Sequence, residues 1–88
     1  MIELVFILPK AWSDLGWWMQ NDKKSVKKIY KLLKNCCKNP FDGLVKPEPL
    51  KAKFSGYWSR KINLEHRLIY KVEDNRIVVI SLYGNYQN

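Results

Sequence analysis

With 88 residues, the chain has room for one domain with a single hydrophobic core and for no separate regulatory module. Hydrophobic residues make up 47% of the sequence, which excludes a disordered tail. Sixteen Lys and Arg residues outnumber eight Asp and Glu residues, and the resulting net charge of +8 is typical of a protein with an anionic partner. Nucleic acid, an acidic protein and an anionic membrane surface all fit that description.

The N-terminal segment predicts a strand followed by a helix. Residues 2–8 are nearly all apolar, which favours a central strand of a sheet. In residues 9–20, Trp12, Leu15 and Met19 recur at helical spacing, so we expect this face of the helix to pack against the rest of the fold.

Two features favour the cytoplasm over a membrane or an exported protein. Residues 2–8 are far fewer than the roughly 20 needed to span a bilayer. With Glu3 inside the run and no basic region before it, the segment does not resemble a signal peptide. Cys36 and Cys37 are adjacent, which disfavours a disulfide between them and matches no metal-site spacing. We interpret both as small apolar residues of a reducing compartment.

Residues 23–38 have the clearest helical pattern, and Asp22 is placed to cap the first turn. The apolar stripe consists of Val26, Ile29, Tyr30, Leu33, Cys36 and Cys37. The remaining surface is rich in lysine, with hardly any carboxylate to balance it: Lys24, Lys27, Lys28, Lys31, Lys34 and Lys38. Lysine is a good helix former, so a solvated face is one interpretation. Because like charges one turn apart repel, we favour contact with an anion.

The C-terminal half predicts a loop and three strands. Residues 41–49 contain one glycine and two prolines and are expected to form the loop. The strands follow at residues 57–62, 66–73 and 76–83, with a hairpin turn at residues 74–75. The order β-α-α-β-β-β predicts an α+β fold in one domain, residues 1–88. A small, mostly antiparallel sheet would carry the two N-terminal helices on one face.

A single histidine excludes any mechanism that needs two, and the sequence holds no glycine-rich phosphate loop, zincin motif or Ser/His/Asp set. We predict neither a metal site nor an organic cofactor. Glu48 lies between Pro47 and Pro49, which hold its carboxylate in a stiff segment among lysines. That arrangement suits a general base acting on a polyanion, and a surface salt bridge accounts for it equally well.

Arg60 and Arg67 are further candidates, because a planar guanidinium suits a phosphate or the extra charge of a phosphorane-like transition state. The alternative is surface pairing with Glu65 or Glu73. His66 is adjacent to Glu65 and, by strand alternation, lies on the face opposite Arg67, which favours a structural role for the imidazole.

Four motifs follow one another in the second half of the chain: Pro40-Phe41-x-Gly43, Lys46-Pro47-Glu48-Pro49-Leu50-Lys51, Ser55-Gly56-x-Trp58-Ser59-Arg60 and Glu65-His66-Arg67-Leu68-Ile69-Tyr70. In these motifs the sequence closely resembles the YoeB/Txe toxins of the RelE superfamily. The resemblance extends over essentially the whole chain, including Trp12, Lys27-Lys28-Ile29 and Tyr86. It implies a ribosome-dependent endoribonuclease that cleaves mRNA in the ribosomal A site through attack of the RNA's own 2′-OH. The product would be a 2′,3′-cyclic phosphate.

On the family pattern, Glu48 matches the general base, Arg67 the stabiliser of charge on the scissile phosphate, and Tyr86 a tyrosine that positions the substrate. Lys51 and Lys61 match basic residues near the RNA, although position 61 is more often arginine in the family. We add to these predicted RNA contacts Arg60, Lys27, Lys28 and Lys31.

One position departs from the pattern. The family typically ends in His-Tyr, with the histidine as general acid, whereas this chain has Asn85-Tyr86 followed by two further residues. An asparagine amide has no proton to give near neutral pH, and general acid–base assistance is worth about 10² to 10⁴ in rate. The chain is therefore slow, takes the proton from another group, or is an attenuated toxin.

The resemblance also implies partners: the ribosome with its mRNA, and a YefM/Axe-like antitoxin with an acidic neutralising segment. Operator DNA would be reached through that antitoxin. Trp17 lies about 140° round its helix from Trp12, where it would serve as an anchor for a partner or a second copy, or be covered by the fold itself. Two rival functions stay open: a ribosome- and antitoxin-binding module that no longer cuts, and a co-repressor acting with its antitoxin.

Overall fold

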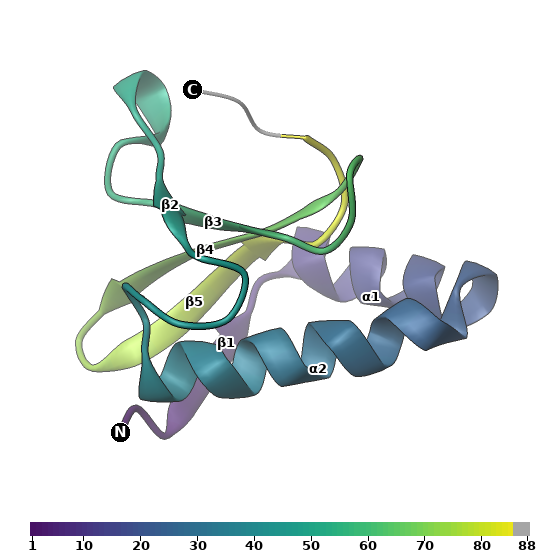
Figure 1. Cartoon of the computed structure of the whole chain (residues 1–88), viewed down its shortest axis with the longest axis horizontal. Helices are drawn as coiled ribbons and strands as arrows, with labels where there is room; N and C mark the ends of the chain where they lie inside the picture. Colours follow the sequence, from purple (N-terminus) through teal and green to yellow (C-terminus); the bar gives the residue numbers. More distant parts are fainter. Residues whose placement is uncertain (86–88) are drawn as a thin grey trace.

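The computed structural model describes residues 1–85, in which two consecutive helices cover one face of a sheet (Figure 1). Helix α1 spans Pro9–Asn21 and α2 spans Lys23–Lys38. The Asp22 carboxylate accepts a hydrogen bond from the Ser25 backbone N–H, so the predicted cap of α2 is confirmed. Neither helix is long and apolar enough to cross a membrane.

The sheet has five strands in the order β1-β5-β4-β3-β2. Their bounds are Leu4–Ile7 (β1), Glu48–Pro49 (β2), Trp58–Lys61 (β3), Arg67–Glu73 (β4) and Arg76–Ser81 (β5). Strand β1 runs parallel to β5, and the other neighbours are antiparallel. Asp74 and Asn75 both have positive φ, 50° and 58°, as a tight hairpin turn requires. The predicted α+β class and the mostly antiparallel sheet are confirmed.

The prediction of a central first strand was wrong. β1 lies at one edge and pairs with β5 alone, which leaves Leu4, Val5 and Phe6 exposed. Ile7 packs against the core, whereas the exposed Phe6 ring has the Arg76 guanidinium 4.7 Å from its centre.

The predicted packing face of α1 was also wrong in part. Trp12 is 65% exposed and Met19 is exposed, whereas Ala11 and Trp18 are fully buried and Leu15 is partly buried. Positions 11, 15 and 18 also follow helical spacing, and the small Ala11 side chain lets the helix approach the sheet closely. In α2 the predicted stripe is confirmed except at Tyr30, which is exposed while Leu32 is buried. Ile29 and Cys36 are fully buried, and the other three members are partly buried against the core: Val26, Leu33 and Cys37.

The expected loop of residues 41–49 ends in a short strand. Glu48 and Pro49 pair with Ser59 and Trp58 of β3, and a 3-10 turn, Ala52–Phe54, follows. Proline can lie in β2 because that strand is at the edge of the sheet. The pairing places Glu48 on the sheet itself.

Candidate active site

Three segments that are distant in the sequence meet at the start of β4. The Glu48 carboxylate lies 3.9 Å from Nη1 of Arg67, and Nε of Arg67 donates to Oδ1 of Asn85 at 3.2 Å. The same Nη1 donates to the Ser59 hydroxyl at 3.2 Å. A carboxylate, a hydroxyl and a side-chain amide are therefore gathered around the Arg67 guanidinium.

The register of the sheet explains this convergence. Glu48 is paired with Ser59, and Lys61 is paired with Arg67. Directly paired residues project on the same face of a sheet, and so do residues two apart on one strand. All four therefore lie on the face opposite the one that the helices cover. We call this face, defined by Glu48, Ser59, Lys61 and Arg67, the open face.

The arginine is held firmly, whereas the carboxylate is accessible. The Arg67 side chain is 17% exposed and the Glu48 side chain 53% exposed. Their separation of 3.9 Å exceeds hydrogen-bond distance, so the pair is a loose contact with a small effect on stability. An accessible carboxylate thus lies directly beside a fixed guanidinium, a pair that combines a possible proton acceptor with an anion-binding group.

The segment after β5 returns to β4 and brings Asn85 to the site. The backbone N–H of Arg67 donates to the Gly84 carbonyl at 3.0 Å, and the Gly84 N–H donates to Nδ1 of His66, also at 3.0 Å. Gly84 has a φ of 113°, a conformation that favours glycine. Tyr86, the fourth predicted catalytic residue, lies outside the described residues.

Arg60 does not lie where the sequence interpretation placed it. It is fully buried on the helix side of β3, so the prediction that it contacts RNA is wrong. Because side chains alternate along a strand, Arg60 is on the same side of β3 as Trp58, and Ile62 follows on that side. Its guanidinium makes four hydrogen bonds, to the Tyr70 hydroxyl, the Asn35 side-chain oxygen and the carbonyls of Leu44 and Asn39. These bonds offset the cost of burying the charge and attach α2 and the following loop to the sheet.

The predicted basic RNA contacts separate into two groups. Lys61 is exposed opposite Arg67 on the open face, and Lys51 is exposed after β2. Lys27, Lys28 and Lys31 are exposed on α2, in the helical layer on the other side of the sheet. One short RNA segment at Arg67 cannot contact both groups, because the sheet separates them.

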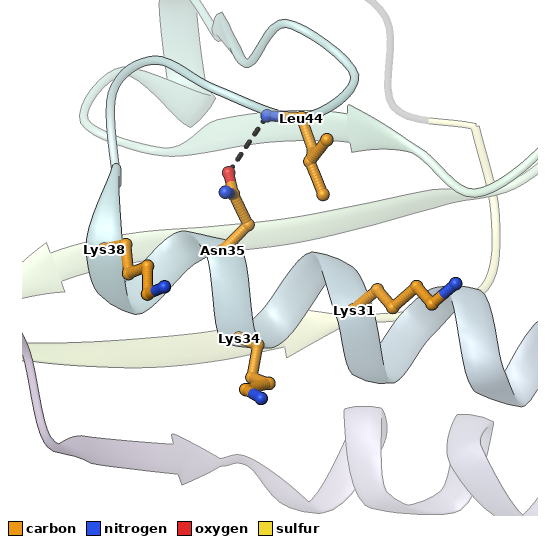
Figure 2. A pocket seen from close by; sticks show the side chains of 5 residues that line it. All are labelled: Lys31, Lys34, Asn35, Lys38 and Leu44. Atoms are coloured by element: carbon orange, nitrogen blue, oxygen red, sulfur yellow. Dashed lines mark hydrogen bonds between the residues drawn. The ribbon is translucent and has the colours of Figure 1, made fainter.

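Beside α2 there is a shallow hollow of about 180 Å³. Figure 2 shows its lining: the side chains of Lys31, Lys34 and Lys38 spread along the helix, and Leu44 faces them from the next loop. The Leu44 N–H donates to Oδ1 of Asn35 at 2.9 Å, which holds the loop against the helix. We call five exposed lysines of this helix the lysine surface of α2: Lys27, Lys28, Lys31, Lys34 and Lys38.

Two residues of the site were missed by the sequence interpretation. Ser59 is fully buried beneath Arg67, and Gly84 supplies the backbone contact that places Asn85. Alternation put Ser59 on the same side as Lys61, and that signal could have identified it. Gly84 carries no comparable signal, because its partner is brought near by the chain's return to β4.

Comparison with known proteins identifies the family of the chain. Residues 7–86 match the model of the YoeB-like toxins of bacterial type II toxin-antitoxin systems. A toxin YoeB from Synechocystis sp. is 53% identical over 77 residues, which are 88% of this chain and 90% of the relative. The chain therefore belongs to the YoeB-like toxin family.

Solved structures share the fold as well as the sequence. A heterotetrameric YoeB–YefM toxin-antitoxin complex from Staphylococcus aureus contains a chain that is 46% identical, with a TM-score of 0.86 and coverage of 96% of this chain and 99% of that one. A YoeB dimer from the same organism is 45% identical, with a TM-score of 0.88 and coverage of 98% and 100%.

Proposed function

We propose that this chain is a ribosome-dependent mRNA endoribonuclease, the toxin of a toxin–antitoxin pair, acting in the cytoplasm. The observation that carries the proposal is the placement of the Glu48 carboxylate 3.9 Å from the Arg67 guanidinium on the open face. The family membership supports the nuclease class, and the net charge of +8 suits a polyanionic substrate.

In the proposed reaction, Glu48 removes the proton from the 2′-OH of the RNA. The 2′-oxygen then attacks the adjacent phosphorus while the bond from phosphorus to the 5′-oxygen breaks. Arg67 stabilises the negative charge that accumulates on the phosphoryl oxygens, an effect worth several kcal/mol in a well-oriented site. The products are a 2′,3′-cyclic phosphate and a 5′-hydroxyl, so the leaving oxygen must receive a proton.

Asn85 occupies the position from which that proton would come. Its Oδ1 accepts a hydrogen bond from Arg67, which leaves the NH₂ group as a hydrogen-bond donor. An amide can stabilise the leaving oxygen in this way but cannot protonate it. We therefore propose an attenuated toxin, slower by about 10² to 10⁴ than one with a general acid at this position.

Asn85 also favours a second candidate function: a module that binds the ribosome and its antitoxin without cutting, and represses transcription together with that antitoxin. YoeB from Staphylococcus aureus has been solved in a heterotetrameric complex with YefM and as a dimer. We propose an acidic YefM-like antitoxin as partner here, with operator DNA reached through it.

Mapping of mRNA 5′ ends on translating ribosomes separates cleavage, ribosome binding without cleavage, and co-repression alone. We expect new 5′-hydroxyl ends in the A-site codon with the wild-type chain and none with Glu48→Gln. Ribosomes that stall without new ends would favour the binding module. Ribosomes that neither stall nor yield cut mRNA would favour the co-repressor.

A further inference from the structure

The His66 side chain binds the backbone of Gly84, the residue before Asn85. Its Nδ1 accepts the Gly84 N–H at 3.0 Å, while the neighbouring Arg67 N–H donates to the Gly84 carbonyl at 3.0 Å. Two consecutive residues at the start of β4 thus bind both polar groups of one peptide residue. The next side chain along, Asn85, accepts from Nε of Arg67.

The hydrogen bond from Gly84 determines which ring nitrogen of His66 is the acceptor. A backbone N–H can only donate, so Nδ1 must carry a lone pair, and in the neutral imidazole the proton is then on Nε2. Nε2 lies 3.9 Å from the Glu65 carboxylate. His66 therefore uses one specific nitrogen as an acceptor, which an apolar core residue could not replace.

Aromatic neighbours hold the ring in this orientation. Tyr83 packs against it with ring centres 4.1 Å apart and planes tilted by 30°, and Trp18 contacts it edge-on at 5.3 Å. Trp17, 40% exposed, lies against Trp18 and Tyr83. The fold itself thus covers much of Trp17, and the imidazole is fixed before any substrate arrives.

The contacts of helix α1 with this segment end before Gly84. Trp18 donates to the Leu82 carbonyl, Asp14 accepts the Leu82 N–H, and Lys10 donates to the Tyr83 carbonyl. Within residues 1–85, the hydrogen bonds recorded for the Gly84 backbone are those with His66 and Arg67. Glycine has the widest backbone freedom of any residue, so these two bonds define where Asn85 goes.

We propose that His66 is a positioning residue for RNA cleavage: through its Nδ1 it holds Gly84 so that Asn85 orients the guanidinium of Arg67. This inference rests on the proposed function. Without the imidazole acceptor, Gly84 keeps, of its bonds within residues 1–85, only the one from the Arg67 backbone N–H, so the segment that carries Asn85 is held less tightly against β4. Arg67 then loses its hydrogen bond from Nε to Asn85, and its guanidinium is less well oriented toward the phosphate.

Two substitutions separate positioning from packing. His66→Phe keeps an aromatic ring against Tyr83 and Trp18 but removes the acceptor. His66→Asn removes the ring but places an amide oxygen close to the position of Nδ1. We expect His66→Phe to lower the single-turnover cleavage rate on saturating programmed ribosomes by about tenfold, because one part-buried hydrogen bond is lost. Ribosome binding should not weaken.

We expect His66→Asn to unfold at a lower temperature than His66→Phe and yet to cleave faster per folded molecule. A purely structural histidine predicts the reverse order, with activity following thermal stability. Activity that tracks stability in both variants would overturn the inference.

Nitrogen-15 NMR supplies a measurement that needs no catalysis. In the wild type we expect a scalar coupling between the Gly84 amide nitrogen and Nδ1 of His66, and slow hydrogen exchange at Gly84. In His66→Phe we expect faster exchange at Gly84 and Asn85. Unchanged exchange would show that His66 does not hold the segment. A wild type that shows the coupling but never cleaves would instead overturn the proposed function, and with it the catalytic consequence assigned to His66.

Discussion

Arg67 and Asn85 are joined by a hydrogen bond from Nε to Oδ1, 3.2 Å long, across 18 positions of sequence. The bond makes the asparagine an orienting partner of the arginine. It also sets which atoms of Asn85 can face a substrate, because Oδ1 is already occupied.

Replacing Asn85 by histidine should restore a general acid. We expect Asn85→His to raise single-turnover cleavage at pH 7 by roughly 10²-fold, since an imidazole with a pKa near 6.5 is often protonated there. The gain should fade as the pH rises past that value, because the proton is then lost. Rates on mRNA-programmed ribosomes from pH 6 to 9 measure this. Asn85→Gln, which keeps an amide, is the control and should show no gain; an unchanged rate in a folded Asn85→His chain would place the proton source elsewhere.

Removing the charge of Glu48 should stop cleavage while leaving ribosome binding intact. The carboxylate is 53% exposed and makes a loose contact with Arg67, so Glu48→Gln should also leave thermal stability nearly unchanged. Single-turnover cleavage and a ribosome pelleting assay measure the two effects. Glu65→Gln is the matched control on the adjoining loop, where the side chain is 85% exposed. Full activity of Glu48→Gln would eliminate the proposed base.

Arg67 should be needed for the transition state more than for binding. We expect Arg67→Ala to lower the cleavage rate by roughly 10² or more, because charge on the phosphoryl oxygens is no longer neutralised. Arg67→Lys keeps the positive charge, but a single ammonium group cannot replace the planar guanidinium that bonds both Ser59 and Asn85. We therefore expect Arg67→Lys to cleave faster than Arg67→Ala but more slowly than the wild type. Equal rates for lysine and arginine would show that charge alone matters at this position.

The lysine surface of α2 should bind a large polyanion, since the sheet separates it from the site. Lys27→Glu combined with Lys31→Glu should weaken ribosome binding and reduce its salt dependence. The slope of log K against log salt concentration should decrease in magnitude by somewhat under one unit for each lost phosphate contact. The double arginine variant at the same positions keeps the charge and is the control. Wild-type affinity at low salt in the folded glutamate variant would exclude this surface.

Burial raises the pKa of the Cys36 thiol to about 11, although the nearby Arg60 guanidinium acts in the opposite direction. The folded state therefore retains a proton that the unfolded chain releases near its ordinary value of 9.0. This contribution to stability is present below about pH 9 and is lost as the pH rises towards 11. We expect the free energy of unfolding to fall over that window in wild type more steeply than in Cys36→Ala. We also expect slow alkylation of Cys36 at pH 8 in the folded chain, and rapid alkylation would contradict its burial.

Several elements follow from local sequence alone. The lysine-rich helix, its Asp22 cap and the tight turn at Asp74 and Asn75 depend on residues within a few positions of one another, so periodicity and turn chemistry were sufficient. The motifs around Glu48 and Arg67 also identified the family, because their order and spacing can be seen along the chain.

Tertiary structure decided which neighbour each element acquired. A hydrophobic pattern states which side of a strand is apolar, but not whether another strand lies beside it, so β1 was misplaced at the centre. Arg60 can be buried because four hydrogen-bond acceptors from α2, the next loop and β4 surround its guanidinium. These acceptors are distant from Arg60 in the sequence, so the local pattern does not predict them. In the same way, the acceptor role of His66 exists because the chain returns to β4 at Gly84, a contact between residues 18 positions apart.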